Sequence, residues 1–373
     1  MMMFLFYVSL VLLAFYVLLI GIYWLGWLAI KPFDNDTSNV KNKFSILVPA
    51  RNEELVITHC LQSIINQNYD NTCYEIMVIN DYSTDDTAGV VSKFINQNPE
   101  YNIRLINMVD DGQQRKLKKA AITFAIEQAL HPYIILTDAD CTRGENWLTT
   151  IHNFIAENDS KLIYAPVEFK ADNTFEKIQS LEFAGLVGIG ASAIQLQNPN
   201  MCSAANLIFE KNVFNEVGGY KGNDGIASGD DEFLLHKVFK RYPDNIHFLK
   251  HIDAVVSTTA NASIQQLADQ RKRWVSKSTK YENRYITAVM VGAYLFNFVV
   301  ALQLIINLKF GLILLLAKAT IEGLFLFDVM RFFKRQKYLL FLPLAEPFHI
   351  LYVLIIGIWG NLGTYNWKDR KLN

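Results

Sequence analysis

The segment Phe44-Ser-Ile-Leu-Val-Pro-Ala50 is a short and almost wholly apolar run with polar sequence on both sides. Such a run predicts a buried β-strand. Residues 53–66 follow with apolar side chains at helical spacing, and Tyr74-Glu-Ile-Met-Val-Ile-Asn80 reads as a second strand. Further along the chain, the pattern predicts strands at 103–108 and 133–137 and a helix at 117–130. This alternation predicts an α/β fold with a mostly parallel sheet and right-handed crossovers.

Acidic residues accompany three of the predicted elements. Asp81 follows the second strand, Asp138-Ala-Asp140 follows the fourth, and Asp230-Asp231 directly precedes a predicted amphipathic helix. Parallel sheets bind ligands beyond the carboxyl ends of their strands. An Asp-x-Asp pair at such an end suits a hard divalent cation that bridges phosphate oxygens. One pair alone is weak evidence, because aspartates are common in loops, but three acidic clusters along one fold indicate a site.

Two basic features accompany these acids. Lys118 lies at the start of the helix before the Asp138 strand, where its charge suits a nucleotide phosphate; a solvated helix start is the simpler alternative. Gln270, Arg273 and Trp274 are spaced i, i+3 and i+4 and therefore share one face of a helix. An amide, a guanidinium and an indole together suit a diphosphate beside a sugar ring. A basic and aromatic helix that rests on lipid headgroups fits the same pattern.

The composition favours a membrane protein. Hydrophobic residues make up 51% of the 373 residues and charged residues 19%, against about 25% charged residues in soluble domains. The net charge of −1 lacks the basic footprint of a nucleic-acid-binding protein. The cysteines show no spacing typical of zinc ligands or of a disulfide framework; they are Cys60, Cys73, Cys141 and Cys202.

The apolar excess lies at the two ends of the chain. Residues 4–30 carry no charge and can cross a hydrocarbon core about 30 Å thick. The basic residues that begin at Lys31 predict an uncleaved anchor followed by a cytoplasmic domain. Residues 285–308 and 310–330 predict two more spans, each with its basic flank on the cytoplasmic side. Residues 338–367 are apolar but broken by prolines and ionisable residues, so they either span the membrane or form a re-entrant or interfacial segment.

One predicted span contains two charged residues. Lys318 and Glu322 are four residues apart and face the same side of the helix, where they can neutralise each other. A buried structural ion pair accounts for them better than an ion pathway does. The predicted organisation is an anchor at 1–30, a catalytic domain at 31–262, an interfacial helix at 263–284, a membrane region of two or three spans at 285–367 and a tail at 368–373.

Together, these motifs resemble the membrane-bound family 2 glycosyltransferases, a group that includes cellulose, chitin, hyaluronan and poly-N-acetylglucosamine synthases and ceramide glucosyltransferases. The resemblance covers about residues 44–274. It rests on five ordered motifs, which are Val48-Pro-Ala-Arg-Asn-Glu53, Asp81-x-Ser-Thr-Asp85, Asp138-Ala-Asp140, Gly229-Asp-Asp231 and Gln270-x-x-Arg-Trp274. Lys118 also matches. The resemblance implies a GT-A fold and inverting transfer of a sugar from a nucleotide sugar, expected to be a UDP-sugar, with Mg²⁺ or Mn²⁺ as cofactor.

The resemblance also implies a role for each matching residue. Asp231 would be the general base, and Asp140 would hold the metal on the diphosphate. Asp230, Gln270 and Trp274 would lie at the acceptor. The residues implied to bind the nucleotide sugar are Pro49, Arg51, Glu53, Asp81, Lys118, Asp138 and Arg273. The chain departs from the family at Asn80, where many relatives carry an acid, and this leaves the nucleotide contact to Asp81.

The resemblance leaves two versions of the enzyme open, a single transfer to a lipid acceptor and processive synthesis of an exported glycan. In both, the protein is a multi-pass protein of the inner or plasma membrane with a cytoplasmic catalytic domain. A non-catalytic membrane scaffold that keeps the same fold is the alternative from another class. The acids at Asp81, Asp140 and Asp231 disfavour it, because a scaffold does not require three convergent carboxylates.

Overall fold

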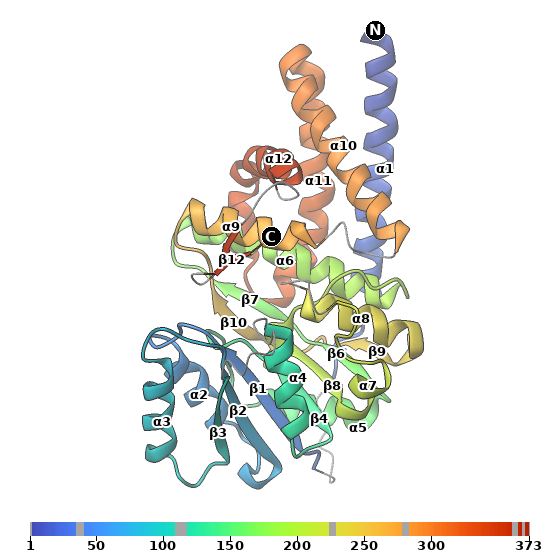
Figure 1. Ribbon diagram of the computed structural model, residues 1–373. Helices are drawn as coiled ribbons and strands as arrows, with labels where there is room; N and C mark the ends of the chain where they lie inside the picture. Colours follow the sequence, from blue (N-terminus) through green and yellow to red (C-terminus); the bar gives the residue numbers. More distant parts are fainter. Residues whose placement is uncertain are drawn as a thin grey trace. The chain divides into compact units, whose positions relative to one another are not determined.

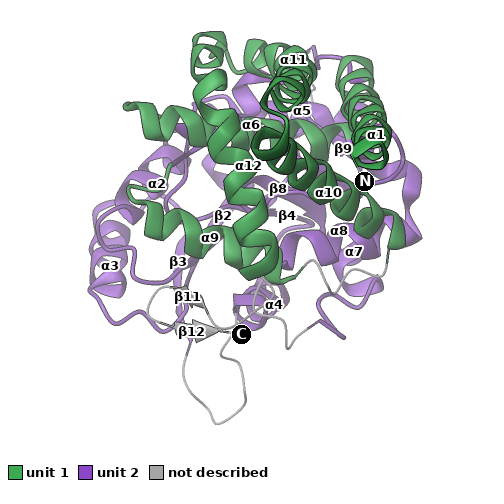
Figure 2. Cartoon of the chain, turned by 90° about the horizontal axis from the view of Figure 1, so that it is seen from above, with its two compact units in different colours: residues 1–29, 171–192, 260–373 green, residues 30–170, 193–259 purple. Residues whose placement is uncertain are grey.

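The computed structural model describes residues 2–34, 41–108, 118–223, 229–277, 283–359, 365–367 and 370–372. The chain forms two compact units (Figure 2). Unit 1 consists of Met1–Ala29, Ala171–Ser192 and Ala260–Asn373, and unit 2 of Ile30–Lys170 and Ala193–Thr259. The predicted catalytic range 31–262 thus contains Ala171–Ser192, as well as its last three residues from Ala260, which belong to the same unit as the apolar ends of the chain.

Unit 2 is built on a seven-stranded sheet with the order β3-β2-β1-β4-β8-β6-β9 (Figure 1). The four predicted strands form its first half, and all neighbouring pairs among them are parallel. They are β1 (Phe44–Ala50), β2 (Tyr74–Asn80), β3 (Ile103–Asn107) and β4 (Tyr133–Leu136). Every residue of β1 except Pro49 is buried, as expected for a strand that is covered on both faces. The predicted α/β fold with a mostly parallel sheet is confirmed.

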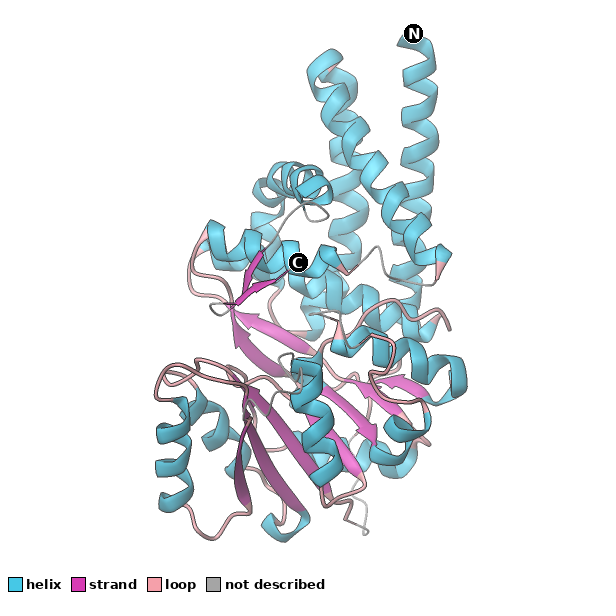
Figure 3. Ribbon diagram, in the orientation of Figure 1, coloured by secondary structure: helices cyan, strands magenta, loops and turns pink. Residues whose placement is uncertain are grey.

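The second half of unit 2 adds antiparallel strands that the sequence pattern does not reveal. β8 (Leu207–Glu210) is antiparallel to β4 and to β6 (Leu162–Tyr164), and β9 (Ile246–Phe248) is parallel to β6. A separate sheet has the order β5-β10-β7 (Figure 3) and consists of β5 (Thr142–Arg143), β10 (Val256–Thr259) and β7 (Val167–Lys170). These strands have two to four residues each, too few to display a period of alternation.

Helices and short 3₁₀ turns connect the strands of unit 2. α4 packs on β1 and β2, and α2 packs against α3. The helices are α2 (Ile57–Ile65), α3 (Thr87–Gln97), α4 (Lys118–Gln128), α5 (Trp147–Glu157), α7 (Lys211–Glu216) and α8 (Asp230–Arg241). The 3₁₀ turns are η1 (Asn71–Cys73), η2 (Ala204–Asn206), η3 (Pro243–Asn245) and η4 (Ile252–Ala254). Residue 117, the first residue of the helix predicted at 117–130, lies outside the described residues.

Four helices of unit 1 are long and apolar enough to cross a membrane, at Met2–Ala29, Arg284–Ile306, Leu308–Phe332 and Gln336–Trp359. They correspond to α1 (Met2–Ala29), α10 (Arg284–Ile306), α11 (Leu308–Phe332) and the pair η6 (Gln336–Phe341) and α12 (Leu342–Trp359). The anchor and the two predicted carboxy-terminal spans are therefore helices of suitable length. Unit 1 also contains α9 (Ile264–Ser276), most of α6 (Thr174–Gln195) and the hairpin β11 (Tyr365–Trp367) and β12 (Arg370–Leu372). Within the predicted tail 368–373, residues 368, 369 and 373 lie outside the described part.

Close packing joins α6 to α11 inside unit 1. A Cβ atom at Gly188 would lie 2.8 Å from side-chain atoms of both Phe325 and Val329. At Gly185 it would lie 3.4 Å from Leu326. Small residues on α6 thus permit the close approach of the two helices.

The predicted ion pair on α11 is present and has a further partner. Nζ of Lys318 lies 2.6 Å from Oε1 of Glu322 and 2.5 Å from Oε2 of Glu346 on α12. The Lys318 side chain is fully buried, and the hydroxyl of Tyr16 on α1 donates a hydrogen bond to Glu322. The ammonium group of Lys318 therefore links α11 to α12, and the hydrogen bond from Tyr16 to Glu322 adds α1 to the cluster.

Candidate active site

Hydrogen bonds join the two loops at the carboxyl ends of β1 and β2. Arg51 is buried, and its Nη1 donates to the carbonyl oxygens of Asp81 at 2.9 Å and Tyr82 at 2.6 Å. The amide of Asp81 donates to the carbonyl of Ala50 at 2.8 Å. Asn52 has a φ of 52° and Tyr82 a φ of 56°, an unfavourable region for residues with a side chain. The contacts hold the backbone of Asp81 in a fixed place at the edge of the sheet.

The Asp-x-Ser-Thr-Asp motif serves this loop connection rather than a helix start. The helix α3 begins only at Thr87, and the hydroxyl of Ser83 accepts from the amide of Asn52 at 3.0 Å. The predicted helix at 53–66 also begins later, at Ile57. The helix begins late because the amide of Glu53 donates to Thr87 Oγ1 at 2.8 Å, which keeps Glu53 in the loop.

Asp85 completes the connection between the two loops. Its carboxylate accepts from Thr87 Oγ1 at 2.5 Å, from the Thr87 amide at 3.1 Å and from the Glu54 amide at 3.1 Å. Burial acts to raise the pKa of Asp85, but these hydrogen bonds outweigh it and lower the pKa below its usual value. Asp85 is therefore held as a carboxylate that fixes the loop.

Lys118 joins the acidic cluster after β4 to the acidic cluster at the start of α8. Its Nζ lies 2.8 Å from Oδ1 of Asp138 and 3.5 Å from Oδ2 of Asp230. Burial favours the neutral amine, but the charges of Asp138 and Asp230 raise the pKa of Lys118 above its usual value. Two of the three predicted acidic clusters therefore meet at one ammonium group.

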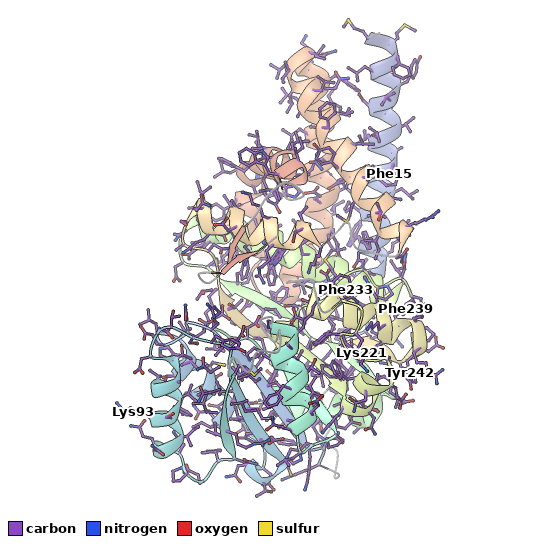
Figure 4. The ribbon with its side chains drawn as sticks, in the orientation of Figure 1. Phe15, Lys93, Lys221, Phe233, Phe239 and Tyr242 are labelled. Carbon is purple, nitrogen blue, oxygen red and sulfur yellow. The ribbon has the colours of Figure 1, made fainter. Side chains whose placement is uncertain are left out.

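The neighbouring Lys119 explains why α4 and α8 meet there. Its Nζ lies 4.7 Å from the ring centre of Phe233 on α8, a residue labelled in Figure 4, and donates to the carbonyl of Asn223 at 3.0 Å. A cation over an aromatic face is attracted by the ring. This contact fixes the start of α4 beside the first turn of α8.

Asp231 lies in the first turn of α8, after Gly229, whose φ is 80°. Its Oδ2 accepts from the amide of Ala204 at 3.2 Å, and its Oδ1 accepts from the amide of Glu232 at 2.8 Å. The backbone amides at a helix start favour a carboxylate. Asp231 is only partly buried. Ser228, which precedes this cluster in the sequence, lies outside the described residues.

Asp140 is half-buried between β4 and β5. Its Oδ2 accepts from the hydroxyl of Thr258 on β10 at 3.0 Å, and its Oδ1 accepts from the thiol of Cys141 at 3.6 Å. The adjacent Arg143 is buried and holds the loop through Thr137 Oγ1 and the carbonyl of Cys141, both at 3.0 Å. Asp138 and Asp140 thus leave β4 with different partners, an ammonium group and a hydroxyl.

The Gln270-x-x-Arg273-Trp274 motif is helical, as predicted, and lies on α9 in unit 1. Oε1 of Gln270 accepts from Nδ2 of Asn261 at 3.0 Å and from Nη1 of Arg271 at 2.9 Å. The guanidinium carbon of Arg271 lies 4.2 Å from the ring centre of Trp274. Arg271, which the motif leaves unspecified, is therefore the residue that contacts both ends of it.

The family model described as Glycosyl transferase family 2 matches residues 45–221. The chain thus matches a glycosyltransferase family 2 domain over a little under half of its length. The matched residues include β1 to β4, with Arg51, Asp81, Lys118, Asp138 and Asp140. The match ends before Asp230 and before the motif on α9.

Relatives of this family 2 domain cover part of the chain. The glycosyltransferase AglE of Haloferax volcanii is 25% identical over 186 residues, which are 50% of this chain and 58% of AglE. The poly-beta-1,6-N-acetyl-D-glucosamine synthase of Staphylococcus aureus is 27% identical over 222 residues, 55% of this chain and 51% of the synthase. The chain thus spans between half and two thirds of the length of these two relatives.

A solved structure has the same fold over nearly the whole chain. It is the mannosyltransferase PcManGT from Pyrobaculum calidifontis in complex with GDP-Man and Mn²⁺, with a TM-score of 0.62 and 17% identity. The superposition covers 93% of this chain and 99% of that protein. The GT-A fold predicted for the family 2 domain is confirmed.

The donor set at Asp140 fits the divalent cation that the family implies. Mg²⁺ and Mn²⁺ prefer oxygen ligands, and Mg²⁺ bound with phosphates takes one or two carboxylates from the protein. Asp140 offers such a carboxylate, whereas Asp138 is paired with Lys118. When bound, the cation stabilises negative charge on a diphosphate.

The sequence places Asn206 in the segment where the resembling enzymes have their acceptor side, but it does not predict the contacts that Asn206 makes inside the fold. Asn206 is fully buried; its Oδ1 accepts from Trp147 Nε1 at 3.1 Å, and its Nδ2 donates to the carbonyls of Pro166 and Ala254. It thereby fixes η2, which precedes β8 and supplies the Ala204 amide to Asp231. The sequence shows a polar asparagine within an apolar run, which indicates a buried hydrogen-bonding role. It does not reveal the partners, because they are 40 to 59 residues away along the chain.

Proposed function

We propose that the protein is an inverting glycosyltransferase that moves a sugar from a nucleotide sugar to a hydroxyl of a membrane lipid or growing glycan. The observation that carries this proposal is Lys118, whose Nζ lies 2.8 Å from Asp138 and 3.5 Å from Asp230. Lys118 thus brings together Asp138, which lies within the matched family 2 segment, and Asp230, which follows that segment in the chain. A partly buried cluster of this kind costs desolvation energy and suits a charged ligand better than a scaffold.

In this proposal, the loops after β1 and β2 form the nucleotide end of the site. Asp81 contacts the base, and Pro49, Arg51 and Glu53 line the same pocket. Arg51 supports this role by holding the carbonyls of Asp81 and Tyr82. The donor is a nucleotide sugar, and the family resemblance favours a UDP-sugar. GDP-Man in the structure of PcManGT is consistent with a nucleotide-linked donor in this fold.

Lys118, Asp138 and Asp140 act at the diphosphate and the sugar. Asp138 contacts the ribose or the transferred sugar, and Asp140 holds Mg²⁺ or Mn²⁺, which supplies Lewis-acid stabilisation to the leaving group. The ammonium of Lys118 adds a fixed positive charge where negative charge develops. Arg273 on α9 keeps its predicted role of neutralising the diphosphate.

Asp231 is the proposed general base. A carboxylate removes the proton of the acceptor hydroxyl while that oxygen attacks the anomeric carbon and the nucleoside diphosphate leaves. One displacement inverts the anomeric configuration. Backbone amides from Ala204 and Glu232 orient the Asp231 carboxylate for this step. Asp230, Gln270 and Trp274 are assigned to the acceptor.

The membrane assignment of the enzyme follows from four candidate spans. We propose a multi-pass protein of the inner or plasma membrane with its family 2 domain in the cytoplasm, because basic residues flank the spans on that side. The small number of carboxy-terminal spans favours glycolipid synthesis over export of a long polymer.

The test incubates membranes that contain the full chain with a panel of radiolabelled nucleotide sugars, with and without EDTA. Lipid and polymer fractions are then analysed separately. Label in the lipid fraction that requires a divalent cation and disappears with Asp231→Asn is expected. Absence of transfer from every nucleotide sugar, with the protein folded and acceptor lipids present, contradicts the proposed function.

A further inference from the structure

Arg271 on α9 is a buried cation next to the residues of the Gln-x-x-Arg-Trp motif. Its side chain is 1% exposed, and its Nη2 lies 2.7 Å from Oε2 of Glu182 on α6. Its Nη1 donates to Oε1 of Gln270 at 2.9 Å, and its guanidinium lies 4.2 Å from the ring centre of Trp274. One guanidinium therefore has an ionic partner, a hydrogen-bond partner and a stacking partner.

Burial makes this arrangement costly unless it is fully paired. A guanidinium in a low-dielectric interior loses hydration that only good geometry and opposite charge offset. Burial acts to lower the pKa of Arg271, but the Glu182 carboxylate outweighs it and raises the pKa above its usual value. Arg271 therefore stays charged, and its position depends on Glu182.

The contacts of α6 with the motif lie on one face of that helix. Gln179, Glu182 and Phe183 are spaced i, i+3 and i+4. Oε1 of Gln179 accepts from the amide of Asn261 at 3.0 Å, and Asn261 in turn donates to Gln270. The ring of Phe183 lies 6.1 Å from the ring of Trp274. Both Gln270 and Trp274 are thus held against α6.

We propose that the Arg271–Glu182 ion pair is a positioning device, which sets the amide of Gln270 and the indole of Trp274 in the orientation that acceptor binding requires. This inference rests on the proposed function, which assigns Gln270 and Trp274 to the acceptor. Arg271 itself does not contact the acceptor. The hydrogen bonds from Asn261 and Arg271 both use the side-chain oxygen of Gln270, so the amide nitrogen is the group that Arg271 orients toward a ligand.

The test compares four variants of the full chain in detergent: Arg271→Lys, Arg271→Met, Glu182→Gln and the double variant Arg271→Met/Glu182→Gln. Arg271→Lys keeps the charge but loses the planar fork and the stacking surface. The double variant removes both charges, so it leaves no unpaired buried ion. The matched control is Arg331→Lys, at a mostly exposed arginine that pairs with the largely buried Asp328 on α11.

If the Arg271–Glu182 pair positions Gln270 and Trp274, the variants should lose activity toward the acceptor without losing stability. Arg271→Lys and the double variant are expected to unfold within a few degrees of the unaltered protein. Their kcat/KM for the acceptor falls about 10²-fold, because small misplacements of binding groups have effects of this size. The KM for the nucleotide sugar stays within about twofold, and Arg331→Lys behaves as the unaltered protein. Full acceptor kcat/KM in a folded double variant would overturn the proposal.

A second readout is independent of transfer. The emission of Trp274, taken as the difference between each protein and its Trp274→Phe counterpart, is expected to shift in Arg271→Met and in Glu182→Gln. The chain has six tryptophans, so this subtraction is needed. An unchanged Trp274 spectrum contradicts the positioning role. If the spectrum shifts but no variant or parent transfers a sugar, the proposed function fails and the positioning of Trp274 stands.

Discussion

Nζ of Lys118 lies 2.8 Å from Oδ1 of Asp138, although the two residues come from separate elements, α4 and the loop after β4. The same ammonium lies 3.5 Å from Asp230 at the start of α8. One ammonium group thus joins α4, the loop after β4 and the start of α8.

Lys118→Met is expected to lower kcat/KM for the nucleotide sugar about 10²-fold, because it removes a fixed charge from the proposed diphosphate site. The raised pKa of Lys118 keeps the amine charged in the folded protein from neutral pH to above its usual pKa. The rate of the unaltered enzyme should therefore not fall through Lys118 deprotonation between pH 7 and 10. Lys93→Met is the control, since Lys93 is exposed on α3 (Figure 4). An unchanged kcat/KM in Lys118→Met contradicts this role.

Asp231→Asn is expected to lower kcat by about 10²- to 10⁴-fold, because the amide cannot accept the acceptor proton. The affinity for the nucleotide sugar, measured by calorimetry on the purified chain, should stay within about twofold. Asp244→Asn, at an exposed residue of η3, is the control. Equal loss of binding and turnover would remove Asp231 from the role of base.

Asp85→Asn tests the hydrogen bonds that join the first two loops. Because the folded-state pKa of Asp85 is depressed, its stabilising contribution is present above the unfolded pKa and is lost as the pH falls through the folded pKa. The thermal midpoint of Asp85→Asn should therefore lie below that of the unaltered protein at pH 6, and the difference should shrink toward pH 3. A difference that is independent of pH would show that the charge is irrelevant.

Lys318→Met leaves the carboxylates of Glu322 and Glu346 without their shared ammonium. Removing one partner of a buried ion pair typically lowers the free energy of unfolding by about 3–5 kcal/mol. Thermal unfolding in detergent measures this loss, and adding Glu322→Gln and Glu346→Gln to the variant should recover much of it. Lys309→Met, at an exposed position of the same helix, should have little effect. Equal stability of Lys309→Met and Lys318→Met contradicts a structural role for the cluster.

The first half of the sheet is predictable because strands such as Phe44–Ala50 are buried on both faces and are therefore apolar along their whole length. The strands from β5 to β10 are too short for a periodic signal, and they pair with residues far along the chain. The residue types of the site were visible as motifs. Their partners were not: Thr258 for Asp140, Ala204 for Asp231 and Glu182 for Arg271 are set by packing between distant elements.

The chain enters and leaves unit 2 around Ala171–Ser192, so α6 is inserted between two stretches of the catalytic unit. A fragment that stops before the carboxy-terminal spans would keep α6 and lose α11, against which Gly188 packs. Its apolar surface would then face water, where it favours aggregation. Attempts to obtain unit 2 as a soluble fragment for nucleotide-sugar binding should therefore replace the segment 171–192 with a short polar linker as well as remove the membrane helices.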